Sequence, residues 1–327
     1  MNERLTLMTK LLLLSLAMTL PSLAAEWEQL PPLPEPNGGG LCGALGTKIV
    51  LVGGTNWEGG TKNWLRAIHE YDPATRTWSK VKDLQEGPVA YGTPLQNGAN
   101  FAFIGGSDGK QAVKAVAIVD GIKTALQPVK DLPSAMVLAA GGSIGGEFII
   151  VGGTDDAANV AGVQSMTHAV MVIDGHWQVR RLADFPGKPF ISAGAAVVSD
   201  ELCVFGGLNW DEPTKEIQNT QSAQAFSLAK NAWRSLRPLP AAVRGLSAVA
   251  LDGRHIYLAG GYAEEFRTEA FIYDVKADSY TPAKPLPYAA MVSLVVCEGH
   301  VYCLGGEDKK QSRTDKFFRI PVAELLK

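Results

Sequence analysis

The sequence has few cysteines, no surplus of basic residues and no apolar stretch long enough to cross a membrane. Its 327 residues include 30 Lys and Arg against 33 Asp and Glu, which gives a formal net charge of −3. Nucleic-acid binding needs a basic surface, so this balance argues against a nucleic-acid partner. A transmembrane helix needs roughly 18 or more apolar residues in a row, and no stretch approaches that length. We therefore expect a small molecule or a protein as the partner.

Cysteine is too scarce to build the domain from disulfides. The chain has only Cys42, Cys203, Cys297 and Cys303. Each lies within or at the end of an apolar run, where a buried free thiol behaves as a small hydrophobic side chain. We expect four free thiols, with one disulfide as the alternative. The sequence contains no Cys-x-x-Cys pair and no His cluster, so we predict no metal site and no cofactor.

The first residues have the pattern of an export signal. Arg4 and Lys10 form a basic start, residues 11–20 are apolar, and Ser22-Leu23-Ala24 offers a cleavage site of the small-x-small type. We predict a signal peptide over residues 1–24 and a mature domain over residues 25–327. The mature protein is then periplasmic or secreted and free of the membrane. A retained anchor helix is the alternative.

The strongest signal in the sequence is a repeat. Six times, four apolar residues run into a double glycine, and successive glycine pairs lie 45 to 54 residues apart. The apolar runs are residues 49–52, 101–104, 148–151, 202–205, 256–259 and 301–304. A period of 40 to 50 residues built from short strands is typical of a β-propeller, and a period of about 50 is typical of kelch repeats.

Each repeat has the pattern of four antiparallel strands. Turn signals such as Asn97-Gly98 and Asp252-Gly253 precede the apolar runs, and their residues supply the positive φ angles of tight hairpins. An aromatic residue opens the expected fourth strand in most repeats: Trp78, Trp177, Trp233 and Tyr280. The sequence therefore predicts an all-β fold, a single six-bladed propeller of the kelch type.

The sixth repeat ends before its fourth strand. Residues 27–34 resemble the fourth-strand segment 233–240, since both segments begin with Trp and end with Pro. We therefore expect the N-terminal strand to complete the last blade and close the ring, which would protect the edges of the strands. The expected first strands are rich in small residues, as they must be where six strands converge on one axis.

A loop in the sixth repeat carries a resemblance to a known family. Residues 306–315 read Gly-Glu-Asp-Lys-Lys-Gln-Ser-Arg-Thr-Asp. This segment resembles the Gly-Glu … Arg-Thr-Asp loop of bacterial N-acetylneuraminate epimerases, also called sialic acid mutarotases. In that family a Glu and an Arg six positions later have catalytic roles, and the resemblance assigns these roles to Glu307 and Arg313. The loop lies in the last blade, as in the cyclically permuted mutarotase group, which residues 53–57 also resemble. The long helical insertion of the family is absent.

Other polar residues are expected at the same channel mouth, because loops after the glycine pairs and loops between blades emerge on one face. Convergent polar groups at such a mouth make a default ligand site. The candidate substrate-binding residues are Asn56, Lys62, Asn63, Asn209, Arg244 and Arg267. A role in packing between blades is the alternative for Arg244. Arg267-Thr268-Glu269 echoes Arg313-Thr314-Asp315, so a structural role also stays open for both arginines.

The proposed chemistry needs two kinds of side chain. Exchange of sugar anomers requires a proton shuttle, for which we predict Glu307, and a cation for the sugar carboxylate, for which we predict Arg313. Among the residues that follow the six glycine pairs, only Glu307 is charged. We expect an exported isomerase acting on N-acetylneuraminate or a related acidic sugar. The alternative is a non-catalytic kelch module that binds protein or glycan.

Overall fold

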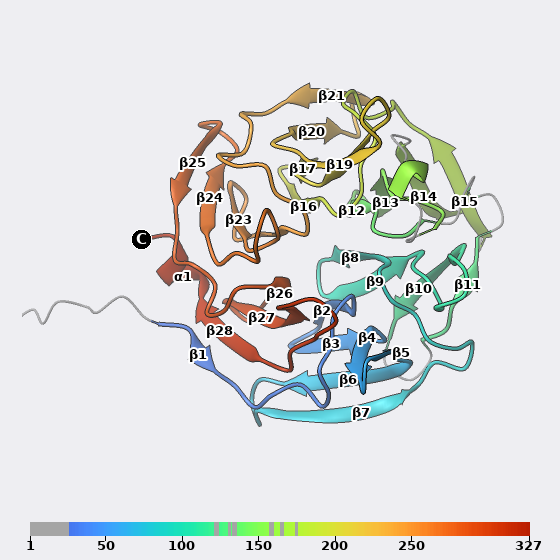
Figure 1. Cartoon of the computed structure of the whole chain (residues 1–327), viewed down its shortest axis with the longest axis vertical. Helices are drawn as coiled ribbons and strands as arrows, with labels where there is room; N and C mark the ends of the chain where they lie inside the picture. Colours follow the sequence, from blue (N-terminus) through green and yellow to red (C-terminus); the bar gives the residue numbers. More distant parts are fainter. Residues whose placement is uncertain are drawn as a thin grey trace, which may run out of the picture.

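The computed structural model of the chain describes residues 26–120, 124–129, 132, 136–156, 160–163, 167–173 and 176–327. The predicted signal peptide lies outside these residues. In the described residues, six four-stranded antiparallel sheets surround a central axis as the blades of a propeller (Figure 1). The predicted fold is confirmed.

The blades follow one another along the chain, each from its inner to its outer strand. Blade one contains β2 (Leu41–Leu45), β3 (Lys48–Val52), β6 (Ala67–Asp72) and β7 (Thr77–Asp83). Blade two contains β8 (Thr93–Asn97), β9 (Asn100–Ile104), β10 (Ala115–Val119) and β11 (Gln127–Pro128). Blade three contains β12 (Ala140–Ile144), β13 (Glu147–Val151), β14 (Thr167–Ile173) and β15 (His176–Arg181).

The second half of the ring is built in the same way. Blade four contains β16 (Gly194–Val198), β17 (Glu201–Phe205), β20 (Ala223–Ser227) and β21 (Ala232–Ser235). Blade five contains β22 (Ser247–Ala250), β23 (His255–Ala259), β24 (Ala270–Asp274) and β25 (Ser279–Pro282). Blade six contains β26 (Met291–Cys297), β27 (His300–Glu307), β28 (Phe317–Pro321) and β1 (Glu28–Gln29).

Smaller elements lie in loops between the second and third strands of a blade, or at the chain end. Two hairpins follow glycine pairs: β4 (Thr55–Glu58) with β5 (Thr61–Trp64), and β18 (Leu208–Asp211) with β19 (Glu216–Asn219). A short 3-10 helix spans Val160–Gly162, and α1 spans Val322–Leu325. No helix among the described residues is long and apolar enough to cross a membrane.

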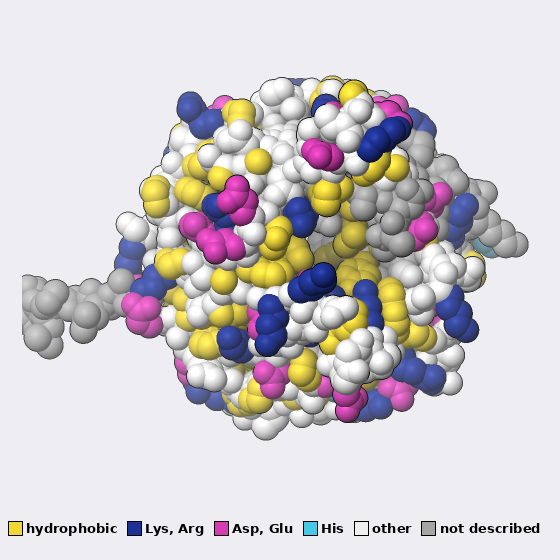
Figure 2. Space-filling view, in the orientation of Figure 1, with side chains coloured by type: hydrophobic (Ala, Val, Ile, Leu, Met, Phe, Trp, Pro, Cys, Tyr) yellow, Lys and Arg dark blue, Asp and Glu magenta, His cyan; other side chains and the backbone are white. Residues whose placement is uncertain are grey.

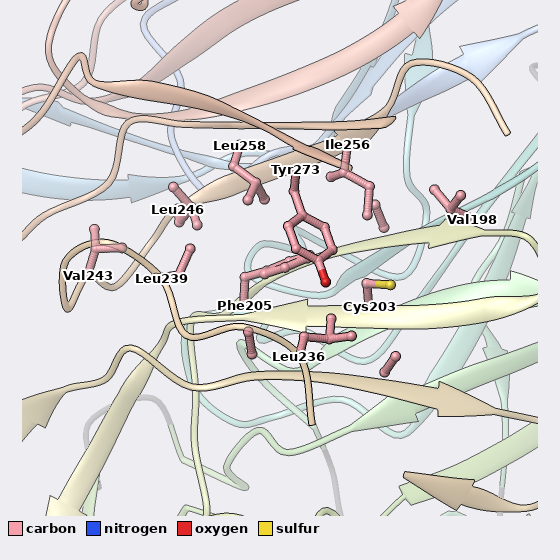
Figure 3. Close-up of a cluster of buried hydrophobic side chains, with 13 residues drawn as sticks. Val198, Cys203, Phe205, Leu236, Leu239, Val243, Leu246, Ile256, Leu258 and Tyr273 are labelled. Carbon is pink, nitrogen blue, oxygen red and sulfur yellow. The ribbon is translucent and has the colours of Figure 1, made fainter. Parts of the chain in front are cut away.

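The core consists of layers between neighbouring blades. Each predicted apolar run is the second strand of a blade and is buried, because a blade has another blade on each of its faces. Figure 3 shows one such layer, where Phe205 of blade four meets Tyr273 of blade five with ring centroids 5.2 Å apart. Burial of this apolar surface is the main stabilising contribution to the fold.

The N-terminal strand closes the ring, as the sequence predicted. β1 pairs with β28, with Glu28 opposite Arg319 and Gln29 opposite Phe318. The Nε–H of Arg319 donates a hydrogen bond of 2.7 Å to Glu28. Chain segments from the two ends of the sequence therefore share one blade, which removes an exposed strand edge.

The four cysteines are free and buried, which confirms the prediction of free thiols. Burial raises the pKa of the Cys42, Cys203 and Cys303 thiols to about 12 and that of Cys297 to about 11. These thiols are therefore protonated at neutral pH and act as small core side chains.

Candidate functional site

The loops after the glycine pairs meet the loops between blades at one end of the central channel. In blades one to five, an isolated β-bridge joins the residue after the glycine pair to the loop that enters the first strand. These bridges are Gly38–Thr55, Ala90–Ser107, Val137–Thr154, Ile191–Leu208 and Arg244–Tyr262. Each glycine pair has positive φ angles, which glycine adopts readily. The predicted convergence of loops on one face is therefore present.

A cavity of about 350 Å³ opens at this channel mouth. Small residues of the loops that enter the inner strands form much of its wall, and Glu307, Arg313 and Tyr91 contribute its ionisable side chains. The cavity shares part of its wall with a deeper one of about 240 Å³. Seen along the axis, the face of the molecule is hollowed at its centre, with Lys and Arg side chains at the edge of the hollow (Figure 2).

Glu307 reaches this mouth because blade six departs from the pattern of the other blades. β27 continues through its glycine pair to Glu307, which pairs with Met291 across a β-bulge. The regular pattern of the other blades would instead place Ala290 opposite Glu307. Bulges commonly redirect a side chain beside a functional site. Here the bulge lies at the end of β27, next to Glu307. Glu307 is the only charged residue among those that follow the six glycine pairs.

Arg313 is buried beside Glu307. Its Nη1 lies 3.1 Å from the Oε2 of Glu307, and the two side chains are 5% and 29% exposed. The Nε–H of Arg313 donates to Thr55 Oγ1 at 3.3 Å, and an Nη1–H donates to the carbonyl of Ser312 at 2.6 Å. An Nη2–H donates to the hydroxyl of Tyr91 at 3.1 Å. The predicted pair therefore comes together, and Arg313 also links blade six to blade one.

Tyr91 is a member of this cluster that sequence reasoning missed. Its hydroxyl lies 3.0 Å from Thr55 Oγ1, in addition to its hydrogen bond from Arg313. Burial alone would raise the pKa of Tyr91, but the charges of Arg313 and Lys62 outweigh that effect and lower it below the ordinary value. A signal in the sequence could have revealed this residue, since Tyr91 is the only aromatic residue at this position in blades one to five, where the others are Gly39, Leu138, Ser192 and Gly245.

Lys62 lies beside Tyr91 at the edge of the site. Its Nζ lies 4.7 Å from the ring centroid of Tyr91 and 4.8 Å from that of Trp64, both within the range of a cation–π contact. Trp64 in turn meets Tyr91 edge to face, with the centroids 5.7 Å apart. The hairpin of β4 and β5 therefore brings one of its predicted residues to the edge of the site.

The two asparagines of that hairpin have other partners. The side-chain amide of Asn63 donates to Asn56 at 2.9 Å, and the amide of Asn56 donates to the Glu35 carboxylate at 3.1 Å. Burial raises the pKa of Glu35 above its ordinary value. Neither asparagine lines the channel cavity that contains Glu307.

Arg244 lies near the mouth, in the loop between blades four and five, and contacts one residue of each blade. Its Nη1–H donates to Asn219 Oδ1 at 2.9 Å, and its guanidinium lies 4.4 Å from the ring centroid of Tyr262. Burial lowers its pKa, and the negative charges of Tyr262 and Glu307 act in the opposite direction. Packing between blades, the alternative considered from the sequence, agrees with these contacts to Asn219 of blade four and Tyr262 of blade five.

Asn209 occupies a separate cavity of about 320 Å³ between blades three and four. Its side chain is 8% exposed, and its Oδ1 has no hydrogen-bond partner among the described residues. The channel cavity does not include this residue.

Arg267 is not the structural counterpart of Arg313. The backbone N–H that donates to the second glycine of the pair belongs to Arg267 in blade five but to Thr314 in blade six. Arg313 therefore corresponds to Phe266, one residue earlier than the sequence echo implied. Arg267 lies 3.7 Å from Glu269 and outside the channel cavity.

Among the residues that the structure describes, no three His, Cys, Asp or Glu side chains gather closely enough to hold a metal ion.

Comparison with known proteins agrees with this architecture. A family model described as Kelch motif matches residues 38–85, which form blade one. The fold is a kelch-type propeller. The propeller is 32% identical over 128 residues to Kelch-like protein 35 of Mus musculus, covering 39% of this chain and 21% of that protein.

Two other similar proteins have the name N-acetylneuraminate epimerase. The one from Pasteurella multocida is 31% identical over 149 residues, covering 45% of this chain and 36% of that protein. The one from Salmonella enteritidis is 23% identical over 180 residues, covering 44% and 47%. The kelch propeller therefore matches less than half the length of each of these curated relatives.

Proposed function

We propose that this kelch propeller is an isomerase that exchanges the α and β anomers of N-acetylneuraminate or a related acidic sugar. The observation that carries the proposal is the Glu307–Arg313 pair, a carboxylate and a guanidinium 3.1 Å apart at the mouth of the channel. The cavity of about 350 Å³ in front of the pair falls in the size range of small-molecule sites. The names of two relatives support the same substrate class.

Anomer exchange proceeds by opening and closing the sugar ring. A base takes the proton of the anomeric hydroxyl, and the electron pair of that O–H bond forms a carbonyl. The bond from the anomeric carbon to the ring oxygen breaks, and the ring oxygen takes up a proton with the released pair. Rotation and the reverse steps give the other anomer. No net oxidation occurs, and Glu307 is the group placed to act as the base.

Arg313 binds the carboxylate of the sugar. Its three nitrogens each donate one hydrogen bond, which leaves one N–H on each terminal nitrogen. A carboxylate that takes these two N–H groups displaces Glu307 from Nη1. This displacement frees the carboxylate of Glu307 to accept the proton of the anomeric hydroxyl.

Proton NMR of freshly released α-N-acetylneuraminate, with and without the protein, tests the proposal. We expect equilibration with the β anomer to be faster in the presence of the protein. Equilibration at the uncatalysed rate would rule out this activity on this substrate.

A non-catalytic binding module is the second candidate. The similarity to Kelch-like protein 35 and the extensive hydrogen bonding of Arg313 favour it. Calorimetric binding of the acidic sugar without acceleration of anomer exchange would establish this candidate in place of the first.

We also propose that the protein is exported, on the basis of the predicted signal peptide over residues 1–24. Cell fractionation and N-terminal sequencing of the mature protein test this, and an intact N-terminus in the cytoplasm would contradict it.

A further inference from the structure

The proposed function assigns a base and a cation but leaves one proton transfer without a group, because the ring oxygen also needs an acid. Tyr91 is an unassigned hydroxyl beside the pair, since Arg313 contacts both Glu307 and Tyr91 through its two terminal nitrogens. Tyr91 also lines the channel cavity together with both residues.

The backbone holds Tyr91 in an unusual conformation. Its φ is +61°, in the left-handed region that bulky residues seldom adopt. Its N–H donates to the carbonyl of Gly39 at 2.8 Å, and its own carbonyl accepts from Leu138 at 2.8 Å. These bonds connect blades one, two and three around the channel. Leu138 and Ser192, at the equivalent positions of the next two loops, have φ of +59° and +56°, so this conformation is a repeated feature of the ring that brings the residue to the channel wall.

Packing explains the ring of Tyr91 but not its hydroxyl. The ring contacts Trp64 edge to face, and a phenylalanine would serve that contact equally well. The hydroxyl is instead in a polar network with Arg313 and Thr55. Thr55 Oγ1 also lies 2.9 Å from the carbonyl of Gly38. The hydroxyl of Thr55 can donate its one proton to the Gly38 carbonyl when Tyr91 is neutral. When the phenol of Tyr91 is ionised, the Thr55 hydroxyl can donate to the phenolate oxygen instead.

Two cations beside Tyr91 stabilise its phenolate form relative to that of an ordinary tyrosine. Arg313 lies on the channel side, with Glu307 as its ion-pair partner, and Lys62 lies over the ring. The cavity on the other side of the ring is lined by Lys110, Asp155 and Asp156. The net effect of Arg313 and Lys62 is to lower the pKa of Tyr91 despite its burial.

We propose that Tyr91 is the second proton-transfer residue of the site, acting on one sugar oxygen while Glu307 acts on the other. This inference rests on the proposed function. In ring opening, the phenol gives its proton to the ring oxygen as the bond to the anomeric carbon breaks, and Glu307 takes the proton of the anomeric hydroxyl. In ring closure, the phenolate takes its proton back, and Glu307 returns its proton to the carbonyl oxygen. Arg313 and Lys62 stabilise the phenolate between the two steps.

The test compares the wild type with Tyr91→Phe, which retains the ring and removes the hydroxyl. We expect the anomer-exchange rate to fall about 10²- to 10⁴-fold, the usual effect of losing an acid–base group. We also expect the decline of the rate at alkaline pH to change, because that limb reports the ionisation of Tyr91. Tyr280→Phe is the matched control, since Tyr280 lies in the outer strand β25, away from the channel, and its hydroxyl donates to the carbonyl of Arg237.

A second measurement does not depend on activity. Burial raises the pKa of six other tyrosines, namely Tyr71, Tyr257, Tyr273, Tyr280, Tyr288 and Tyr302. In an ultraviolet titration, an early tyrosinate signal is therefore expected from Tyr91. This signal should be absent from Tyr91→Phe and present in Tyr280→Phe.

The outcomes separate this inference from the proposed function. A wild type without activity overturns the proposed function, and with it the catalytic role of Tyr91. An active wild type with an equally active Tyr91→Phe overturns only the inference. Persistence of the early tyrosinate signal in a folded Tyr91→Phe variant also contradicts it. Loss of both activity and signal, with an unchanged melting temperature, supports the role of Tyr91.

Discussion

Gly38 leaves open the space that the side chain of Arg313 occupies. A Cβ at Gly38 would lie 2.1 Å from the Cδ of Arg313 and 2.4 Å from its Nε, closer than atoms can approach. The arginine therefore lies against the backbone of the loop that enters blade one. The site depends on this contact between the first and last blades, which the closure of the ring by β1 holds together.

Gly38→Ala tests this contact. The added methyl group must displace Arg313 from Glu307 and Tyr91, and we expect the exchange rate to fall roughly 10- to 100-fold, as for other small misplacements of a catalytic group. Gly253→Ala is the matched control, because a Cβ there meets no atom within 4 Å and the glycine has no positive φ. Equal rates for the two variants in the NMR assay would contradict the account.

Arg313 is expected to distinguish acidic from neutral sugars. Arg313→Ala should weaken binding of N-acetylneuraminate roughly 10- to 100-fold, in line with ~1.5–3 kcal/mol for hydrogen bonds to a charged group. The loss should be much smaller for neutral N-acetylmannosamine. Arg313→Lys should also weaken binding of the acid, because an ammonium group lacks the planar two-point contact. Titration calorimetry with both sugars measures these effects.

Arg267→Ala provides the comparison for that experiment. Because Arg267 lies outside the channel cavity, we expect its removal to change the affinity for either sugar by no more than about twofold, as at most surface sites. If Arg267→Ala and Arg313→Ala had the same effect on the acidic sugar, Arg313 would not be a dedicated carboxylate-binding residue.

The fold could be predicted from the sequence because each blade repeats the same local pattern. An apolar run that ends at a glycine pair marks β3, β9, β13, β17, β23 and β27, and similarity between residues 27–34 and 233–240 revealed the closing strand. These features are local or repeated, and so a single chain contains enough examples of them to reveal the pattern.

The site was only partly predictable. Glu307 ends β27 and Arg313 lies in the loop that follows it, so their approach needs no knowledge of the ring. Tyr91 joins them from the loop between blades one and two, and its approach depends on ring closure and on the space at Gly39, where a Cβ would lie 2.3 Å from the tyrosine ring. The sequence comparison aligned Arg267 with Arg313 because both are arginines. The backbone hydrogen bonds instead align Arg267 with Thr314, one residue further along the chain.

Two buried histidines predict how stability depends on pH. Burial lowers the pKa of His168 to about 4 and also lowers that of His69, which occupies the equivalent strand position in blade one. The unfolded chain binds these protons near the ordinary value of 6.5, before the folded chain does. Their contribution to stability is therefore present above pH 6.5 and is lost as the pH falls toward 4.

Urea unfolding at neutral pH and at about pH 4.5 measures this effect. We expect the loss of stability on acidification to be smaller in His168→Gln than in the wild type. His176→Gln, at an exposed position in the same blade, should keep the wild-type pH dependence. An unchanged pH dependence in His168→Gln would show that its imidazole is not the titrating group.

The most direct measurement of the central claim is the rate of anomer exchange by proton NMR for the wild type, Glu307→Gln and Glu265→Gln. Glutamine keeps the shape of Glu307 but cannot accept and return a proton, so we predict a loss of about 10²- to 10⁴-fold. Glu265 is an exposed acid in the corresponding loop of blade five, and its variant should match the wild type. A folded Glu307→Gln variant that exchanges anomers at the wild-type rate would contradict the assignment of Glu307 as the base.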